Sequence, residues 1–249
     1  MSQLDQHVAV ITGGNSGIGV ASAKRLARAG ARVAIFGRTA DTVQRAAECL
    51  GDNVIGVQGD VTSSEDLERL FKQTHDTFGR VDSVFANAGV AEFRTLEETD
   101  PEHVSRMLDT NLRGVILTLQ AALPHLNNPA SVIVTTSIVN AKGMPGTGAY
   151  AASKAGLRAL VRVWANELAG RGIRVNAISP GPVETQIFSR MGMSKAEIEA
   201  FAAATTASIP LARFGQPSEI AAAVEFLASP ASSLMTGTEL VLDGGYSQV

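Results

Sequence analysis

Short runs of aliphatic and β-branched residues recur along the chain and alternate with longer segments of helical periodicity. Short apolar runs bounded by turn residues predict strands. When such strands alternate with helices, they are typical of a parallel sheet that is covered on both faces. The predicted strands are 8–11, 33–36, 54–57, 84–86, 132–134, 175–178 and 239–242. This pattern predicts an α/β fold: a Rossmann-type, doubly wound, seven-stranded parallel sheet in a three-layer sandwich.

The same pattern predicts the domain organisation. An α/β chain of 249 residues commonly forms one domain, so 1–249 is expected to fold as a single unit. The segment 181–213 interrupts the alternation with glycines and prolines around a short helix that starts near Ser194. Because this segment follows the sixth strand, at the edge where ligands enter such sheets, we predict that it is a mobile substrate lid.

Composition and charge disfavour several function classes. A net charge of -3 and the lack of any run of five like charges argue against a nucleic-acid partner. Cys49 is the only cysteine, which excludes an internal disulfide and a thiolate metal cluster. The N-terminus lacks the pattern of a signal peptide, and no apolar stretch reaches transmembrane length. We therefore expect a cytoplasmic protein that has no metal site and no membrane partner.

A glycine-rich segment, 12–19, follows the first predicted strand and opens a helix. Glycines let the backbone approach a pyrophosphate closely, and the helix N-terminus offers N–H groups and partial positive charge. The alternative is a tight link between strand and helix with no ligand. The predicted cofactor contacts in this segment are Gly13, Asn15, Ser16, Gly17, Ile18 and Gly19.

The end of the second strand bears on the type of cofactor. An acid at this place would accept a hydrogen bond from a ribose 2′-hydroxyl, whereas a base would neutralise a 2′-phosphate. The strand is followed by Arg38 and Thr39, and no carboxylate stands at its end. We therefore expect NADP(H), with NAD(H) as the alternative, because Arg38 is also readable as a solvated loop cation.

Polar and small residues follow the third and fourth strands at the same sheet edge, where they can hold the adenosine. Asp60 and Val61 come after the third strand, and Asn87, Ala88 and Gly89 come after the fourth. Two simpler interpretations stay open. Asp60 can cap the helix that begins near residue 63, and Asn87 can be a turn former.

Tyr150 and Lys154 form a candidate proton-transfer pair. They lie four residues apart in a predicted helix, 149–169, and therefore on one helix face. A free phenol has a pKa of about 10, and a neighbouring ammonium is expected to lower it. The tyrosine can then exchange a proton with a carbonyl or carbinol oxygen.

Two further polar residues belong to this candidate site. Ser137 closes the fifth strand, where its hydroxyl can polarise the reacting oxygen; the alternative is a turn hydroxyl. Asn111 stands in a helical pattern that is followed by Gly114, and both are poor helix formers. Two interpretations of Asn111 stay open. It can mark a local break in the helix, where its side chain binds a water or a backbone carbonyl, or it can be a side chain that faces solvent.

With these motifs in this order, followed by Pro180 and Gly181, the chain resembles the short-chain dehydrogenase/reductase family over its whole length, and in particular members similar to 3-oxoacyl-carrier-protein reductase. The resemblance implies that Tyr150 is the acid/base, that Ser137 binds the substrate oxygen, that Lys154 holds the nicotinamide ribose and that Asn111 holds a relay water. It also implies a homotetramer. The cofactor contacts would continue after the sixth strand with Pro180 and Gly181, and Val183 and Thr185 would fix the nicotinamide carboxamide.

The sequence departs from the family pattern in two respects. Ala86 replaces the first asparagine of the usual Asn-Asn-Ala-Gly motif. In addition, neither Asn15 nor Ser16 is the basic residue that would help to hold a 2′-phosphate. The second departure weakens the NADP(H) prediction and does not reverse it.

The function predicted from the sequence is reversible hydride transfer between NADP(H) and a small ketone or secondary alcohol. The alternatives are a 3-oxoacyl-carrier-protein reductase, an NAD-dependent alcohol or sugar dehydrogenase, and a non-catalytic dinucleotide-binding regulator. The segment 123–130 has no arginine or lysine to present to an acidic carrier protein, although Arg171 and Arg174 remain, and this favours a small molecule. Met144, Phe188 and Met191 are predicted to line an apolar substrate pocket.

Overall fold

The predicted α/β fold is confirmed by a computed structural model of the protein, which describes residues 4–185 and 195–249. All seven strands are parallel and follow the order β3-β2-β1-β4-β5-β6-β7. The strands are β1 (Val8–Thr12), β2 (Arg32–Gly37), β3 (Val54–Gln58), β4 (Val81–Ala86), β5 (Leu126–Thr135), β6 (Ile173–Pro180) and β7 (Glu239–Leu242). The order reverses between β1 and β4, which is the switch point where such sheets bind ligands.

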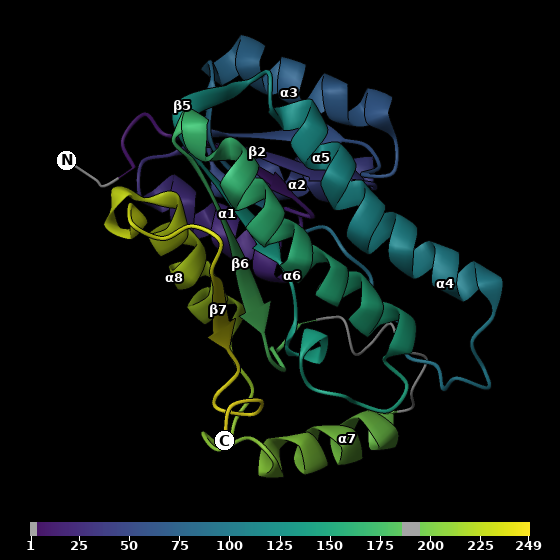
Figure 1. Cartoon of the computed structure of the whole chain (residues 1–249). Coiled ribbons are helices and arrows are strands. Elements are labelled where there is room, and N and C mark those ends of the chain that lie inside the picture. Colours follow the sequence, from purple (N-terminus) through teal and green to yellow (C-terminus); the bar gives the residue numbers. More distant parts are fainter. Residues whose placement is uncertain (1–3, 186–194) are drawn as a thin grey trace.

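Helices cover both faces of the sheet (Figure 1). One face packs on α1 (Gly17–Arg28), α2 (Ala40–Leu50) and α8 (Pro217–Ala228). The other packs on α3 (Ser64–Phe78), α5 (Gly114–Ala122) and α6 (Gly148–Leu168). The remaining helices are α4 (Pro101–Leu108) and α7 (Lys195–Ala207), with short helical turns η1 (Asp109–Arg113), η2 (Ile138–Asn140), η3 (Ala169–Arg171) and η5 (Pro230–Ser232).

Alternation along each strand explains the two cores. In β1, Val8 and Val10 pack into the core on the α3, α5 and α6 side, while Ala9 and Ile11 pack into the core on the α1, α2 and α8 side. Successive side chains of a strand point to opposite faces, so a strand between two helical layers is expected to be mostly apolar on both faces. The unbroken apolar runs of the sequence therefore follow directly from a sheet buried on both faces.

Several elements extend beyond the sequence-based bounds, among them β4, β6 and the following three segments. The fifth strand, β5, spans Leu126–Thr135 and is longer than the predicted 132–134. The helix predicted over 149–169 is α6, followed by the 3-10 turn η3. In the segment 181–213 the helix α7 has 13 residues, so this part of the chain is more regular than the short helix that the sequence suggested.

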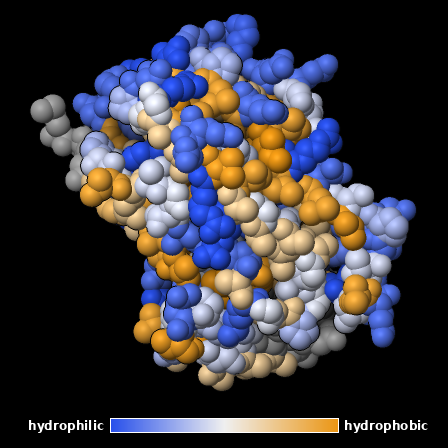
Figure 2. All heavy atoms as spheres, viewed as in Figure 1, coloured by the Kyte–Doolittle hydropathy of each residue, from blue (hydrophilic) through white to orange (hydrophobic). Residues whose placement is uncertain are grey.

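The surface view shows hydrophobic residues gathered over the face formed by α5 and α6 (Figure 2). Val163 on α6 is 48% exposed, and Trp164 next to it is only partly buried. Among the described residues, no helix combines the length and the apolar character that crossing a membrane requires.

Candidate active site

Asn87 joins the two strands at the switch point. Its backbone N–H donates to Thr12 Oγ1 over 3.1 Å, and its Nδ2 donates to the Thr12 carbonyl over 3.2 Å. Thr135 Oγ1, at the end of β5, donates to Asn87 Oδ1 over 3.2 Å. Asn87 therefore links the ends of β1, β4 and β5 by hydrogen bonds, so its role goes beyond that of a turn former.

The glycine-rich loop between β1 and α1 requires its glycines. Gly13 and Gly17 have φ values of +64° and +50°, a region that favours glycine. A Cβ at Gly19 would stand 2.0 Å from the Gly13 carbonyl oxygen. Ser16 caps α1 without a side-chain hydrogen bond, and no acid lies in the first turn. The N–H groups of this helix start are thus free of a competing carboxylate, as an anion site requires.

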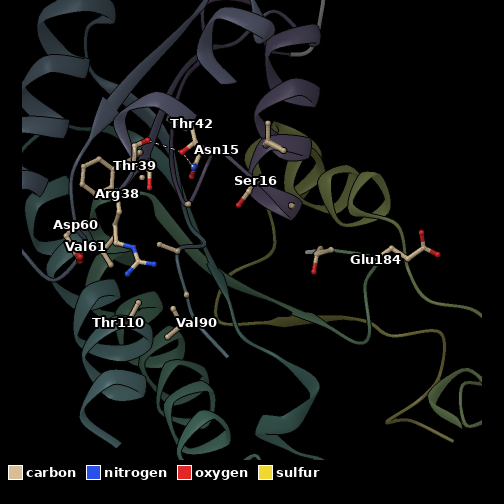
Figure 3. A pocket seen from close by; sticks show the side chains of 18 of the residues that line it. Asn15, Ser16, Arg38, Thr39, Thr42, Asp60, Val61, Val90, Thr110 and Glu184 are labelled. Atoms are coloured by element: carbon tan, nitrogen blue, oxygen red, sulfur yellow. Dashed lines mark hydrogen bonds between the residues drawn. The ribbon is translucent and has the colours of Figure 1, made fainter. Parts of the chain in front are cut away.

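A cavity of about 1240 Å³ opens along this loop at the carboxyl ends of β1 to β4 (Figure 3). Of the predicted cofactor residues, those that line it are Gly13, Asn15, Ser16, Gly17, Arg38, Thr39, Asp60, Val61, Ala88, Gly89 and Thr185. The predicted residues that do not line it are Ile18, Gly19, Asn87, Tyr150, Lys154, Pro180, Gly181 and Val183. The cavity exceeds the ~300–1,000 Å³ usual for small ligands and is large enough for a dinucleotide.

Arg38 points into this cavity near Asp60 and Val61 (Figure 3). Within the described part of the chain, no carboxylate pairs with its guanidinium. Beside it, Asn15 Nδ2 donates to Thr42 Oγ1 over 2.9 Å. This end of the cavity therefore combines an unneutralised cation with hydrogen-bonding side chains.

The helix α3 is capped by Ser63, whose Oγ accepts a hydrogen bond from Asp66 N. Asp60 is not the cap. Its Oδ1 accepts hydrogen bonds from the N–H and the hydroxyl of Thr62, over 2.9 and 2.8 Å. This turn holds Asp60 at the cavity wall next to Val61.

Tyr150 and Lys154 lie on α6, and Ser137 caps η2 directly after β5. The Ser137 hydroxyl lies beside the Tyr150 phenol and acts to lower its pKa. Lys154 Nζ donates to the Thr135 carbonyl over 2.8 Å and lies 5.8 Å from the centre of the Tyr150 ring. Ser137 from the end of β5 and the pair Tyr150 and Lys154 from α6 thus meet at one edge of the sheet.

The electrostatics of this cluster differ from the sequence prediction. Burial raises the pKa of Tyr150, and the hydrogen bond with Ser137 offsets only part of that rise. Burial also lowers the pKa of Lys154 to about 8. The prediction that the ammonium lowers the phenol pKa is therefore wrong for this state, because Lys154 directs its proton to Thr135 O and desolvation favours both neutral forms.

Asn111 lies in the π-helical turn η1, between α4 and α5. Its Oδ1 accepts from Val90 N and its Nδ2 donates to Val90 O, both over 2.8 Å, and Nδ2 also reaches Ser153 Oγ over 3.3 Å. The side chain is fully buried. The helix break is therefore present, and the solvent-facing alternative is wrong. The break holds the loop that follows β4 against α6.

Comparison with known proteins identifies the family. The family model described as enoyl-(acyl carrier protein) reductase matches residues 13–247. An oxidoreductase of Sarocladium schorii is 40% identical over 100% of this chain and 99% of its own, and a 3-oxoacyl-[acyl-carrier-protein] reductase of Vibrio cholerae is 36% identical over 97% and 98%. The solved short-chain dehydrogenase/reductase of Serratia marcescens has a TM-score of 0.91 at 33% identity and covers 98% and 99% of the two chains.

The chain belongs to the short-chain dehydrogenase/reductase family. Members of this family are oxidoreductases that use a nicotinamide dinucleotide, so this protein is an oxidoreductase with a cofactor of that kind. Among the described residues, no group of three or more histidine, cysteine or acidic side chains is placed to hold a metal ion.

The substrate side of this short-chain dehydrogenase/reductase is only partly described. Met144 lies half-buried on the loop between η2 and α6, whereas Phe188 and Met191 lie outside the described residues. Sequence reasoning missed Phe93, whose ring centre lies 6.2 Å from that of Tyr150. No local sequence pattern indicates that Phe93 contacts Tyr150. The contact depends on two loops that meet in space, where Arg94 N donates to Gly146 O over 2.8 Å.

Proposed function

We propose that the protein is an NADP(H)-dependent oxidoreductase that transfers a hydride between the nicotinamide and a small ketone or secondary alcohol, with Tyr150 as acid/base. The observation that carries this proposal is that Ser137, Tyr150 and the buried Lys154 come together at the sheet edge that also bears the dinucleotide-sized cavity. A pocket that adjoins titratable groups of shifted pKa is the usual mark of an active site.

The residues of the cavity fit the cofactor. Gly13, Gly17 and the uncapped start of α1 suit a pyrophosphate, and Asp60 and Val61 suit the adenine. The unneutralised Arg38 guanidinium matches the oxygens of a 2′-phosphate, which favours NADP(H) over NAD(H). When bound, the nicotinamide would supply or accept the hydride.

The chain's own residues would handle the proton and the oxygen. Ser137 Oγ would donate a hydrogen bond to the carbonyl oxygen, which increases the positive charge on the carbonyl carbon. Tyr150 would donate its phenolic proton to the same oxygen as it becomes an alcohol. Lys154, held at Thr135 O, would position α6 and bind the neighbouring ribose. Asn111 would fix the floor of the site through Val90.

We propose a small molecule as the substrate in preference to an acyl carrier protein. The segment 123–130, which includes the first residues of β5, itself has no arginine or lysine, and the arginines that contact it, Arg80 and Arg171, donate to its backbone carbonyls. We also propose that residues 181–213 form the substrate lid and that the protein works in the cytoplasm as a homotetramer. The hydrophobic α5 and α6 face, with Val163 exposed, supports a tetramer interface there (Figure 2).

Cofactor titration tests the first half of the proposal. NADPH and NADH are titrated by fluorescence into the wild type, Arg38→Ala and a control, Arg45→Ala, which removes an exposed arginine of α2. NADPH is expected to bind about tenfold tighter than NADH, and Arg38→Ala is expected to remove most of that advantage, about 1.4 kcal/mol. If NADH binds the wild type equally well, the NADP(H) assignment is wrong.

Single-turnover reduction of a ketone panel tests the second half. Tyr150→Phe removes only the phenolic oxygen, and a general acid of this kind contributes roughly 10²–10⁴-fold to the rate. We expect a loss in that range with NADPH affinity unchanged. If the wild type binds NADPH but reduces no ketone, and with NADP+ oxidises no alcohol, the protein is better described as a non-catalytic dinucleotide-binding regulator.

A further inference from the structure

The last residues of the chain fold into a compact turn beyond β7. Asp243 is 9% exposed and organises this turn, because its Oδ1 accepts from Gly245 N over 2.9 Å and its Oδ2 accepts from Ser247 N over 2.7 Å. Gly244 and Gly245 have φ values of +65° and +92°, which suit glycine. The C-terminal tail, defined here as residues 243–249, is therefore a built structure and not a loose end.

The C-terminal tail contacts the loop that follows Ser137. Lys142 Nζ donates to the Tyr246 carbonyl over 2.9 Å. The same ammonium lies 4.4 Å from the centre of the Tyr246 ring, which is within the range of a cation–π contact. Lys142 is itself held by its own backbone, since Lys142 N donates to Ile138 O over 2.8 Å. One lysine thus joins the tail to the loop between η2 and α6, which also bears Met144.

The C-terminal tail also contacts the end of the proposed lid. Leu211 N donates to Gly244 O over 3.1 Å. Ile209 and Pro210 pack so closely that a Cβ at Gly244 would stand 2.8 Å from Ile209 Cγ2 and one at Gly245 would stand 3.0 Å from Pro210 Cγ. Figure 1 places the C-terminus beside the end of the sheet over which α7 lies. The tail therefore bridges both segments that border the substrate side.

We propose that Lys142 and Tyr246 are a positioning pair that holds the loop 141–147 at a fixed distance from residues 209–213 and so limits the size of the carbonyl substrate. The effect on substrate size rests on the proposed ketone reduction, whereas the spacing of the two loops rests only on the contacts given above. A tail that bridges two walls of a pocket sets the width between them. Loss of the pair lets the walls separate and admits bulkier ketones.

Hydrogen exchange measured by mass spectrometry tests the mechanism without requiring activity. Lys142→Met removes the ammonium, and Tyr246→Ala removes the ring. Two controls match them: Tyr246→Phe keeps the ring, and Lys72→Met removes a lysine from an exposed pair on α3. Peptides that cover 141–147 and 209–213 are expected to exchange about threefold faster in the first two variants and at the wild-type rate in the controls. Unchanged exchange in Lys142→Met overturns the proposal.

Ketone kinetics test the consequence. In Lys142→Met and Tyr246→Ala, the ratio of kcat/KM for an aryl ketone to that for a small aliphatic ketone is expected to rise about tenfold, through KM of the aryl ketone. The kcat for the small ketone and the affinity for NADPH should stay at wild-type values. An equal loss for both ketones overturns the role in substrate size. If the wild type reduces neither ketone, the proposed function fails, while the exchange result still decides whether the pair holds the two segments.

Discussion

Lys154 should make the stability of this protein depend on pH in a way that can be isolated. Its side chain is 3% exposed, and burial lowers its pKa from the usual 10.5 to about 8. A difference of one pH unit in pKa corresponds to about 1.36 kcal/mol, so folding with a charged Lys154 costs about 3 kcal/mol. Replacement of this one side chain should remove that cost.

The direction of the effect follows from where the proton is held. Below about pH 8 the folded and unfolded chains both bind the Lys154 proton, and the cost is present in full. Between about pH 8 and 10.5 the unfolded chain binds more protons than the folded chain, so the free energy of unfolding rises with pH. About 2 kcal/mol of this rise should occur between pH 7.5 and 9.5. Tyr150 contributes only at higher pH, because burial raises its pKa above the usual 10.0.

The assay is urea unfolding, followed by the fluorescence of Trp164, the single tryptophan, at half-unit steps from pH 7.5 to 9.5. The wild type is compared with Lys154→Met and with Lys72→Met, a control whose lysine is 73% exposed. Other titrating groups are common to all three proteins and cancel in the differences. The wild-type free energy of unfolding should rise by about 2 kcal/mol relative to Lys154→Met and not relative to Lys72→Met. Parallel curves for the wild type and Lys154→Met would refute the argument.

Two further substitutions test the residues around the proposed acid. Asn111→Ala leaves the N–H and the carbonyl of Val90 without their partners, which costs roughly 1–3 kcal/mol for each group. The free energy of unfolding, measured in urea, should therefore fall several-fold more than in the control Asn166→Ala, which changes an exposed residue of α6. Phe93→Ala should raise KM for an aryl ketone about tenfold, whereas Leu96→Ala on the same loop, 92% exposed, should leave steady-state kinetics unchanged; equal effects would contradict the Phe93 contact.

The fold was predictable from the sequence because the signal is repeated. The central strands are buried on both faces, so most of their positions are apolar, and each helix that covers the sheet presents one hydrophobic stripe to it. Element bounds were less predictable. The extra residues of β5, which begin at Leu126, include Asn127 and Asn128, which no strand pattern would indicate. In α7 the helix continues to Ala207 because alanine favours it, although the surrounding glycines and prolines suggested a shorter one.

The positions of the site residues were predictable for a different reason. Parallel strands end at one edge, so the residues that follow them must gather there, and Ser137 joins Tyr150 from a distance of thirteen positions. The helix break at Asn111 was visible as a poor helix former ahead of Gly114. The contacts of Phe93 and of Lys142 with Tyr246 were not visible, because each joins loops whose approach depends on how the whole molecule packs.

Burial shifts the pKa of Tyr150 upward and that of Lys154 downward, so both side chains favour their neutral forms. Proton donation to a carbonyl oxygen requires a protonated phenol, and burial keeps Tyr150 in that form well above neutral pH. Oxidation of an alcohol requires the phenolate, which a charge close to the phenol oxygen would have to stabilise. Lys154 instead holds its ammonium at Thr135 O, and burial already weakens its hold on that proton near pH 8. Under the proposed mechanism, the neutral phenol of this state can donate a proton to a carbonyl oxygen at neutral pH, whereas proton removal from an alcohol needs the phenolate.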